Sequence, residues 1–551
     1  MRMWGPSGAG AAIRRAQAVS RLARQAGCGV DEAAALLDQP VTRRAVLGLA
    51  GAGAVAGLGA ALPRRREAAS TPRHAPRVVI AGSGIAGLGC ALRLWHRYGI
   101  RAEVYEWNTV PGGRIRTLRE FFDDGQLVEE HADFINPEHT ATLALAKRFG
   151  LRLDNTDKYA PGTHPGREVM RFHGRKWPQE ALNRDWHEWG WKLFHHAAYV
   201  TAPWPQLHSA HNPGGRRFDR MSVTEWIGRY VPGGTASDFG ALCIAATLDE
   251  FGGPADETSA LNLVYLLGQD ASTDSGAQPH DAPQLAGADE KWHVHGGNDQ
   301  LITGILGRLP RGTLHPGHRL VAVRRRGPGY RCSFDRGGTV RDVTADHVVL
   351  ALPFTVLRSV DLRRVPITPL HRRAIHEEPL GTNSKIFMQY GSRVWNAAGT
   401  TGNCFDDGVV QGGWDATSRQ AGQAGILAAL PGGRSAADWG RRYGLTGHRG
   451  RPPDSMVTAF RRDFDLLFPS TSPAFNGRSF YVWSPGDPHL RGAYSYLATG
   501  QFTGFNGVQG QREGNLHFAG EHTSQDYQGY IEGALRSGYR CAAEIGARSG
   551  P

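Results

Sequence analysis

The sequence predicts an α/β fold built around a Rossmann-like dinucleotide-binding domain. A short apolar strand, Val78–Ala81, leads into the glycine-rich turn Gly82-Ser83-Gly84-Ile85-Ala86-Gly87. A helix-like apolar stretch follows the turn, and a second strand ends at Glu106. A strand, a glycine turn, a helix and a second strand ending in an acid form the unit that holds dinucleotides by their diphosphate.

Each part of this unit has an expected role. Gly82, Gly84 and Gly87 let the backbone turn and approach a pyrophosphate, and Ala86 lies in the helix start whose amide groups face the phosphates. Glu106 lies 19 residues past the last glycine, where an acid accepts hydrogen bonds from the ribose hydroxyls of a cofactor without a 2′-phosphate. The alternative is a glycine-rich turn of an ordinary α/β protein, and the flanking strands and the acid favour the cofactor site.

A second phosphate-binding element, Gly112-Gly113-Arg114, comes directly after the Glu106 strand. Gly113 allows close passage of the chain, and the Arg114 guanidinium offers a fork for phosphate oxygens, which NAD-binding folds do not require. Further motifs follow at Gly296-Gly297-Asn298, Gly381-Thr382-Asn383-Ser384-Lys385, Gly492-Ala493-Tyr494, Ala519-Gly520-Glu521-His522-Thr523 and Gly529-Tyr530-Ile531-Glu532-Gly533-Ala534. With these motifs the chain resembles the flavin-containing amine oxidase family over roughly residues 76–546.

The resemblance implies an amine oxidase-like fold with two interleaved domains. A Rossmann-like FAD-binding domain would comprise residues 76–150, 291–353 and 500–551, and an α+β substrate-binding domain would comprise residues 151–290 and 354–499. At 551 residues the chain is too long for one core, which agrees with such a division.

Local patterns predict the remaining elements of the FAD-binding domain. Leu320–Val323 and Tyr330–Phe334 alternate in the manner of strands, and 346–352 is a continuous apolar strand stopped by a proline. A strand at 516–520 and a long helix at 530–547 close the chain.

The resemblance assigns cofactor contacts outside the glycine turn. Glu521 would hold the ribityl chain of FAD, and Leu320 is expected beside the cofactor. The last helix begins next to Ile531, and its partly positive N-terminus would stabilise negative charge on the reduced flavin ring. Ala493 stands where some monoamine oxidases carry a cysteine bonded to the flavin, so FAD is expected to bind non-covalently.

Lys385 is the expected catalytic residue. The family lysine at this position holds a water against flavin N5, where a cation stabilises the anionic intermediates of reoxidation by O2. Tyr494 and Tyr530 match two facing aromatics that align a neutral amine with the flavin, and Trp483 is expected in the same pocket. The alternatives are an exposed lysine on a strand edge and ordinary core aromatics.

The activity implied by the resemblance is FAD-dependent oxidation of a primary or secondary amine to an imine. Hydrolysis would then give an aldehyde or ketone and ammonia, and O2 would be reduced to hydrogen peroxide. Some L-amino-acid oxidases carry an arginine for the substrate carboxylate where this chain has Phe134, which favours amines. An L-amino-acid oxidase, another FAD desaturase or isomerase of the superfamily, and a binding or electron-transfer flavoprotein remain as alternatives.

The N-terminal 75 residues predict export. Thr42-Arg43-Arg44-Ala45-Val46-Leu47 leads into an apolar Ala/Gly-rich stretch ending near Leu62, the pattern of a twin-arginine signal, so a periplasmic, cell-surface or extracellular location is expected. An uncleaved membrane anchor is the alternative. Residues 1–41 form a long leader, and 64–76 is a polar linker.

Composition excludes two other function classes. The net charge of +12 lies mostly in residues 1–75, and the body has no long basic run, so a nucleic-acid partner is not expected. The six cysteines are scattered without a CxxC pair. His293 and His295 have no carboxylate or cysteine that would complete a metal site, so no metal is expected.

Overall fold

The computed structural model of the chain describes residues 15–20, 22–23, 29–37, 75–156, 167–268 and 290–549. A five-stranded parallel sheet, in the order β20-β13-β1-β2-β9, forms the centre of the nucleotide-binding part. Its strands are β1 (Val78–Ala81), β2 (Ala102–Tyr105), β9 (Leu314–His315), β13 (His347–Leu350) and β20 (Leu516–Phe518). The predicted α/β fold with a Rossmann-like sheet is confirmed, and the strands are drawn from distant parts of the chain.

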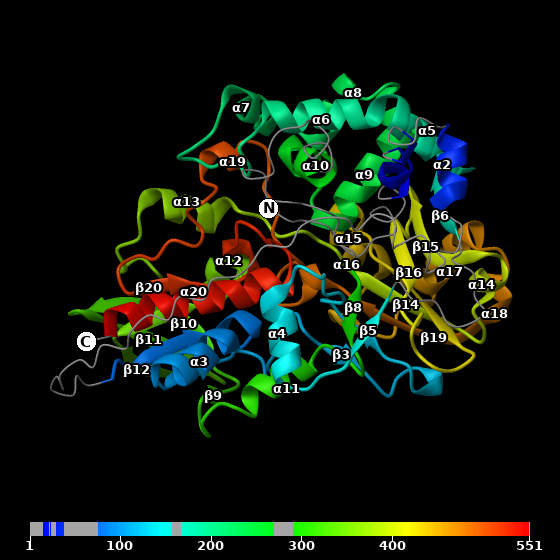
Figure 1. Cartoon of the computed structure of the whole chain (residues 1–551). Helices are drawn as coiled ribbons and strands as arrows, with labels where there is room; N and C mark the ends of the chain where they lie inside the picture. The colour runs from blue at the N-terminus through cyan, green and yellow to red at the C-terminus, as the bar shows by residue number, and fades with distance from the viewer. Residues whose placement is uncertain are drawn as a thin grey trace, which may run out of the picture.

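Two helices lie side by side on one face of this sheet, α3 (Ile85–Tyr98) and α20 (Ile531–Ser549) (Figure 1). Glycines allow the close approach, because a Cβ on Gly89 would lie 2.6 Å from a Leu535 methyl carbon and one on Gly538 would lie 2.1 Å from the Ala86 carbonyl oxygen. The contacts join early residues of one helix to early residues of the other. Both helices therefore begin at the same end of the sheet.

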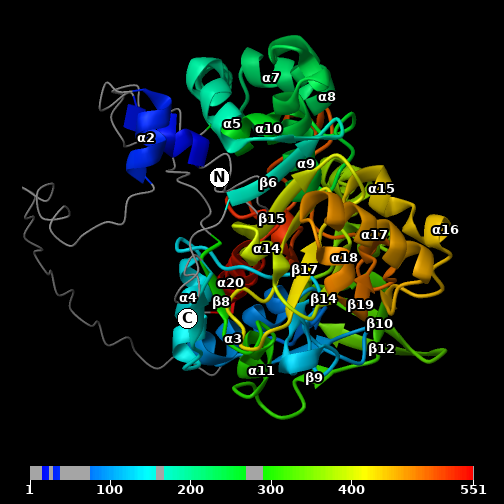
Figure 2. The ribbon, with the colours of Figure 1, turned by 90° about the vertical axis from the view of Figure 1, so that its right-hand side faces the viewer.

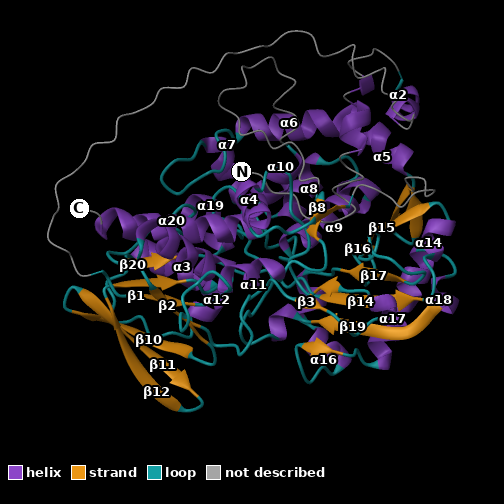
Figure 3. Cartoon of the chain, turned by 60° about the horizontal axis from the view of Figure 1, so that its bottom comes forward, coloured by secondary structure: helices purple, strands orange, loops and turns teal. Residues whose placement is uncertain are grey.

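The opposite face of the parallel sheet packs against a second, antiparallel sheet (Figure 3). This sheet consists of β10 (Arg319–Arg326), β11 (Gly329–Arg336) and β12 (Thr339–Ala345). The alternation of β1 divides its side chains between two cores: Val79 packs with Tyr330 and Phe334, whereas Ile80 faces the helices.

Smaller elements border the helices and the sheet. They are α4 (Thr140–Arg148), α11 (Gln300–Leu306), and the two-stranded pairs β3 (Thr117–Leu118) with β4 (Val128–Glu129) and β5 (Leu153–Asn155) with β8 (Trp292–Val294).

An eight-stranded sheet forms the base of the second part of the molecule (Figure 2). Its order is β18 (Arg449–Gly450), β19 (Phe475–Val482), β14 (Lys385–Tyr390), β17 (Gly425–Ala429), β16 (Gly412–Asp415), β15 (Thr400–Asp406), β6 (Arg167–Phe172) and β7 (Arg175–Trp177). Only β15 and β6 pair in parallel among these neighbours. The first residue of the buried strand β14 is Lys385.

Helices cover this part and connect it to the first. One group is α5 (Gln179–Asp185), α6 (Trp191–Val200), α7 (Pro213–Asp219), α8 (Val223–Tyr230), α9 (Asp238–Phe251) and α10 (Ala260–Leu267). The other is α12 (Phe354–Leu357), α13 (Pro369–Glu377), α14 (Val394–Ala397), α15 (Gly433–Ala437), α16 (Trp439–Tyr443), α17 (Asp454–Leu467), α18 (Thr471–Ala474) and α19 (Gln501–Gly504).

Part of the N-terminal leader is folded. The helix α2 (Val30–Leu37) lies near α5, and the Ser20 hydroxyl lies 3.1 Å from His187 Nδ1. The twin-arginine segment and its apolar stretch lie outside the described residues. Within the described ranges, no helix combines the length and apolar character needed to cross a bilayer.

Candidate active site

A large cavity runs from the glycine turn of the nucleotide-binding part to strand β14 of the second part. It contains about 1780 Å³ of space that no atom fills, part of which is open to solvent. The sequence-predicted residues that line it are Gly82, Gly84, Ala86, Glu106, Gly113, Arg114, Lys385, Tyr494, Glu521, Tyr530 and Ile531.

The glycine turn leaves open space where a diphosphate would lie. Gly82 has φ +104°, and a Cβ there would lie 2.4 Å from the Ala351 carbonyl oxygen, so the turn itself needs glycine. A Cβ on Gly84 would meet no atom within 4 Å. Gly84, the N-cap residue of α3, therefore faces the cavity beside the first-turn amide groups of the helix, which have no partners within it.

Three sequence-predicted residues do not line the cavity. A Cβ on Gly87 would lie 2.1 Å from the Gly82 carbonyl oxygen, so Gly87 permits packing of α3 on the turn. The Leu320 side chain is buried in the core between the two sheets, because the alternation of β10 turns it there. Trp483 packs on Gly440 and donates its indole N–H to the Ala436 carbonyl 3.0 Å away, so it stabilises α15 and α16 instead of lining the pocket.

Glu106 holds the loop at the ribose end of the cavity. One of its carboxylate oxygens accepts hydrogen bonds from the Ser83 amide and hydroxyl, both at 2.8 Å. The other accepts from the Asn108 amide at 2.7 Å. The acid at the end of β2 is thus fixed against the glycine turn, and its position fits the predicted contact with the ribose.

Arg114, which is partly exposed, forms an ion pair with the buried Glu521 in the cavity wall. Arg114 Nη1 lies 2.9 Å from Glu521 Oε1 and also donates to the Ala493 carbonyl. The other Glu521 oxygen accepts from the Ser495 hydroxyl at 2.7 Å and from the Gly529 amide at 2.8 Å. Burial raises the pKa of Glu521, but the charges of Arg114 and His522 and the hydrogen bonds from Ser495 and Arg114 together outweigh it, so this pKa lies below its ordinary value. Arg114 therefore carries a carboxylate partner that sequence reasoning did not assign to it.

Lys385 lies in the cavity wall as predicted, and protein groups hold its ammonium. Its ammonium donates to the Asp133 carboxylate, to the His131 carbonyl at 2.7 Å and to the Glu129 carbonyl at 3.2 Å. An ammonium has three N–H donors, and protein acceptors occupy all three. The ammonium is thus fixed against the end of β4 and the segment after it, and its contact with a water beside flavin N5 stays a prediction.

Tyr494 and Tyr530 both line the cavity and are both anchored on the end of α9. The Tyr494 hydroxyl donates to the Asp249 carbonyl, and the Tyr530 hydroxyl donates to a Glu250 carboxylate oxygen at 3.2 Å. The Tyr530 ring also contacts the His139 ring edge-on, with centroids 5.0 Å apart. These anchors fix both rings in the cavity wall.

Sequence reasoning missed five carboxylates of the cavity wall, Glu130, Asp133, Glu250, Glu290 and Asp487. Asp133 and Glu290, together with Phe134, also line an adjoining pocket, so they stand at the junction of two spaces. Asp133 lies in the same short segment as Phe134, and only its pairing with Lys385 reveals its position. Glu250 and Glu290 had no local signal, because each lies in a region of weak resemblance.

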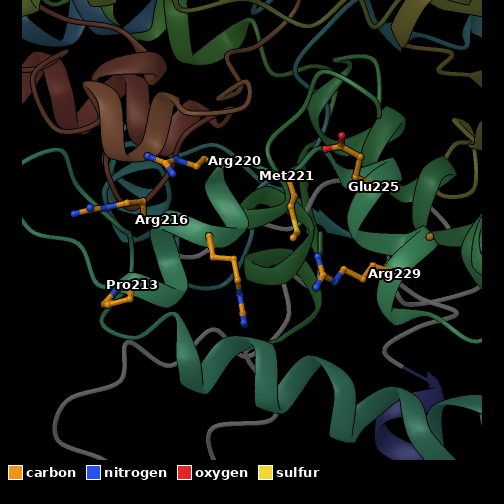
Figure 4. Close-up of a pocket in the computed structure, with 8 residues that line it drawn as sticks. Pro213, Arg216, Arg220, Met221, Glu225 and Arg229 are labelled. Atoms are coloured by element: carbon orange, nitrogen blue, oxygen red, sulfur yellow. The ribbon is translucent and has the colours of Figure 1, made fainter.

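A separate basic groove lies on the surface of α7 and α8 (Figure 4). Arg216, Arg217, Arg220 and Arg229 line it, together with Glu225. Glu225 is used within the protein, because it forms a capping box with Ser222 at the start of α8. The groove shares no residue with the cavity and contains no sequence-predicted site residue, so it is not the candidate active site.

Comparison with known proteins gives the family. The sequence profile described as flavin containing amine oxidoreductase matches residues 85–546. AofH of Mycobacterium tuberculosis, which is named as a flavin-containing monoamine oxidase, is 25% identical over 495 residues, covering 88% of this chain and 99% of its own. An L-amino acid dehydrogenase of Synechocystis is 23% identical over 499 residues, covering 85% of this chain and 94% of its own.

A solved structure shares the fold. Cyclohexylamine oxidase from Brevibacterium oxydans aligns with 86% of this chain and 99% of its own at a TM-score of 0.70 and 21% identity. The predictions of FAD as the cofactor and of an oxidoreductase that acts on amines are confirmed by the family match. The chain belongs to the flavin-containing amine oxidoreductase family.

Proposed function

We propose that this FAD-dependent amine oxidase acts on a primary or secondary amine that carries no α-carboxylate, with O2 reduced to hydrogen peroxide. The amine becomes an imine, which water hydrolyses to an aldehyde or ketone and ammonia, or a primary amine where the substrate is secondary. The observation that carries the choice of substrate is a pair of carboxylates in the cavity wall: Glu250 and Glu290 line the same cavity as the two tyrosines. Asp133 also lines the cavity, but Lys385 is its ion-pair partner.

These carboxylates favour a cation over an amino acid. Two unit charges about 6 Å apart at an effective dielectric constant of about 20 interact with about 3 kcal/mol, which corresponds to about 100-fold in affinity. The carboxylates attract an ammonium group by this interaction and repel an α-carboxylate. The arginines of the cavity wall, Arg114 and Arg116, belong to the segment after the second glycine element, and Arg114 is already paired with Glu521.

The residues of the chain position the reactants. When bound, FAD supplies the two-electron acceptor for the C–H bond of the amine. Tyr494 and Tyr530, fixed through α9, confine the amine and orient it. The start of α20 at Ile531 presents a partly positive helix end to the cavity, which favours negative charge at that wall.

Turnover of a substrate panel tests this proposal. We expect the purified full-length protein to release hydrogen peroxide with amines and to have a kcat/KM for the matching L-amino acids lower by about 100-fold. A preference for L-amino acids would support the second candidate, an L-amino-acid oxidase, to which the dehydrogenase relative points. Flavin reduction by amines without peroxide release would show that O2 is not the acceptor.

Non-covalent attachment of FAD is a separate prediction. Ala493 offers no thiol, and none of the described cysteines, Cys90, Cys243, Cys332, Cys404 and Cys541, lines the cavity. Acid denaturation followed by filtration should therefore leave all the flavin in the filtrate. Yellow colour that stays with the denatured polypeptide would contradict the prediction.

We further propose that the twin-arginine segment, Thr42–Leu47, exports the folded enzyme. The support is the sequence pattern, because this segment lies outside the described residues. Export of folded protein suits an enzyme that takes up FAD before leaving the cytoplasm. Replacing Arg43 and Arg44 by lysine should retain the protein in the cytoplasm of an expressing bacterium, and unchanged export would overturn this proposal.

A further inference from the structure

Acceptor groups of the protein surround the ammonium of Lys385, the cation that is expected to lie beside the flavin. Lys385 and Asp133 are buried, with 5% and 9% of their side chains exposed. The ammonium is saturated by the Asp133 carboxylate and two backbone carbonyls. The Trp414 ring lies 5.3 Å from the same ammonium group. These four groups all attract the positive charge, and one of them, Asp133, is a carboxylate.

The sign of the local charge matters for the reaction with O2. Return of the two electrons from the reduced cofactor to O2, with two protons, gives hydrogen peroxide, and its first electron produces superoxide, an anion. A cation beside the flavin stabilises that anion and accelerates the step. A lysine whose charge is balanced by an adjacent carboxylate gives a much smaller field, because the two charges nearly cancel at a distance.

We propose that Asp133 is a positioning residue that neutralises the Lys385 ammonium and thereby slows the reaction of the reduced enzyme with O2. The proposal rests on the proposed function in taking FAD as the bound cofactor and O2 as its oxidant, and on the expected position of Lys385 beside flavin N5. It assigns to Asp133 a role that depends on its contact with Lys385 and not on the identity of the amine. The acid holds the lysine against the segment after β4 and lowers its effective charge.

Protonation of Asp133 should remove this restraint. Burial raises the pKa of Asp133 to about 6, against the lowering effect of Lys385. The other charged groups that act on Asp133 are Glu129 of β4 and His293 of β8. Glu129 Oε1 lies 2.9 Å from His293 Nε2. Above this pKa the carboxylate is ionised and cancels the lysine charge, and below it the lysine charge is uncompensated. The rate of reoxidation should therefore rise as the pH falls through about 6.

Stopped-flow reoxidation of the full-length holoenzyme tests the proposal. The flavin is reduced with dithionite, so that the measurement does not depend on the amine, and is then mixed with O2. At a pH well above the pKa of Asp133, we expect Asp133→Asn to react about tenfold or more faster than the wild type, with no pH dependence near the pKa of Asp133. Asp133→Glu should restore the slow rate, because it restores the negative charge.

Sulfite affinity gives a readout besides turnover. Sulfite is an anion that adds to oxidised flavin at N5, and a cation nearby favours the adduct. We expect Asp133→Asn to bind sulfite about tenfold more tightly than the wild type. Asp219→Asn is the matched control, because Asp219 is a buried acid outside the cavity that accepts hydrogen bonds from Ser259 and Thr503. It should leave both quantities unchanged.

If the Asp133→Asn variant does not fold, the pH dependence of wild-type reoxidation tests the proposal in its place. The wild-type rate must then rise on acidification, and Lys385→Met must abolish that rise. A reoxidation rate and sulfite affinity that are unchanged in Asp133→Asn, or a wild-type rate that is flat through the pKa of Asp133, would overturn the proposal. A protein that binds FAD but oxidises no amine would instead contradict the proposed function and leave this experiment feasible.

Discussion

Gly84→Val should give a folded protein that does not retain FAD. A Cβ at this position meets no protein atom within 4 Å, and the backbone there, with φ −64° and ψ 171°, accepts any residue. The added side chain enters the space that a diphosphate needs at the start of α3. We expect loss of about 100-fold or more in FAD affinity, because the phosphates are displaced from the helix amides, each a charge-assisted hydrogen bond.

The control for this experiment is Gly228→Val. Gly228 also has no atom within 4 Å of its Cβ position, and it lies on α8 away from the cavity. It should retain FAD fully. The measurements are bound flavin after gel filtration and thermal melting of the two apoproteins. A Gly84→Val protein that stays yellow would show that the diphosphate does not lie on this turn.

Glu521→Ala should lose both FAD and stability. The carboxylate is 3% exposed and is the partner of Arg114, Ser495 and the Gly529 amide. Removing one member of a buried ion pair costs about 3–5 kcal/mol, because the remaining charge is left without compensation. The freed Arg114 and the loosened Gly529 segment also change the wall on which the flavin ring would lie, so we expect FAD affinity to fall by about 100-fold.

Acid should reproduce part of this loss. The pKa of Glu521 is lowered in the folded protein, so the ionised carboxylate stabilises the fold fully when the pH is above the ordinary carboxyl pKa. This stabilisation is lost as the pH falls through the lowered pKa. Glu544→Ala provides the comparison, because Glu544 also pairs with an arginine, Arg540, at 2.8 Å, but lies outside the cavity. That variant should melt at a lower temperature yet keep its FAD. Equal loss of FAD in both variants would assign Glu521 a structural role only.

Local patterns in the sequence were sufficient for the nucleotide-binding unit. The strand, the glycine turn and Glu106 lie within 30 residues of each other, and their chemistry depends on backbone geometry that neighbours in sequence determine. The structure places Gly84 and Glu106 in the cavity wall as expected. The family match confirms the cofactor type that these residues indicate.

Contacts between distant segments could not be predicted in this way. Asp133 and Lys385 are 252 residues apart, and their pairing depends on how β14 lies against the segment after β4. Trp483 is near Tyr494 in sequence, but it follows β19 and turns toward α15 and α16. Leu320 lies on a strand whose alternation directs it into the core. In each case the packing of two elements decides the side-chain direction, and neither element alone contains that information.

Anaerobic titration of the purified full-length protein with an amine tests the central claim most directly. We expect a yellow protein with one FAD for each chain, whose absorbance in the blue is bleached by the amine and far less by the matching amino acid. A colourless preparation that takes up no flavin on reconstitution would contradict the account. So would bound FAD that no amine reduces.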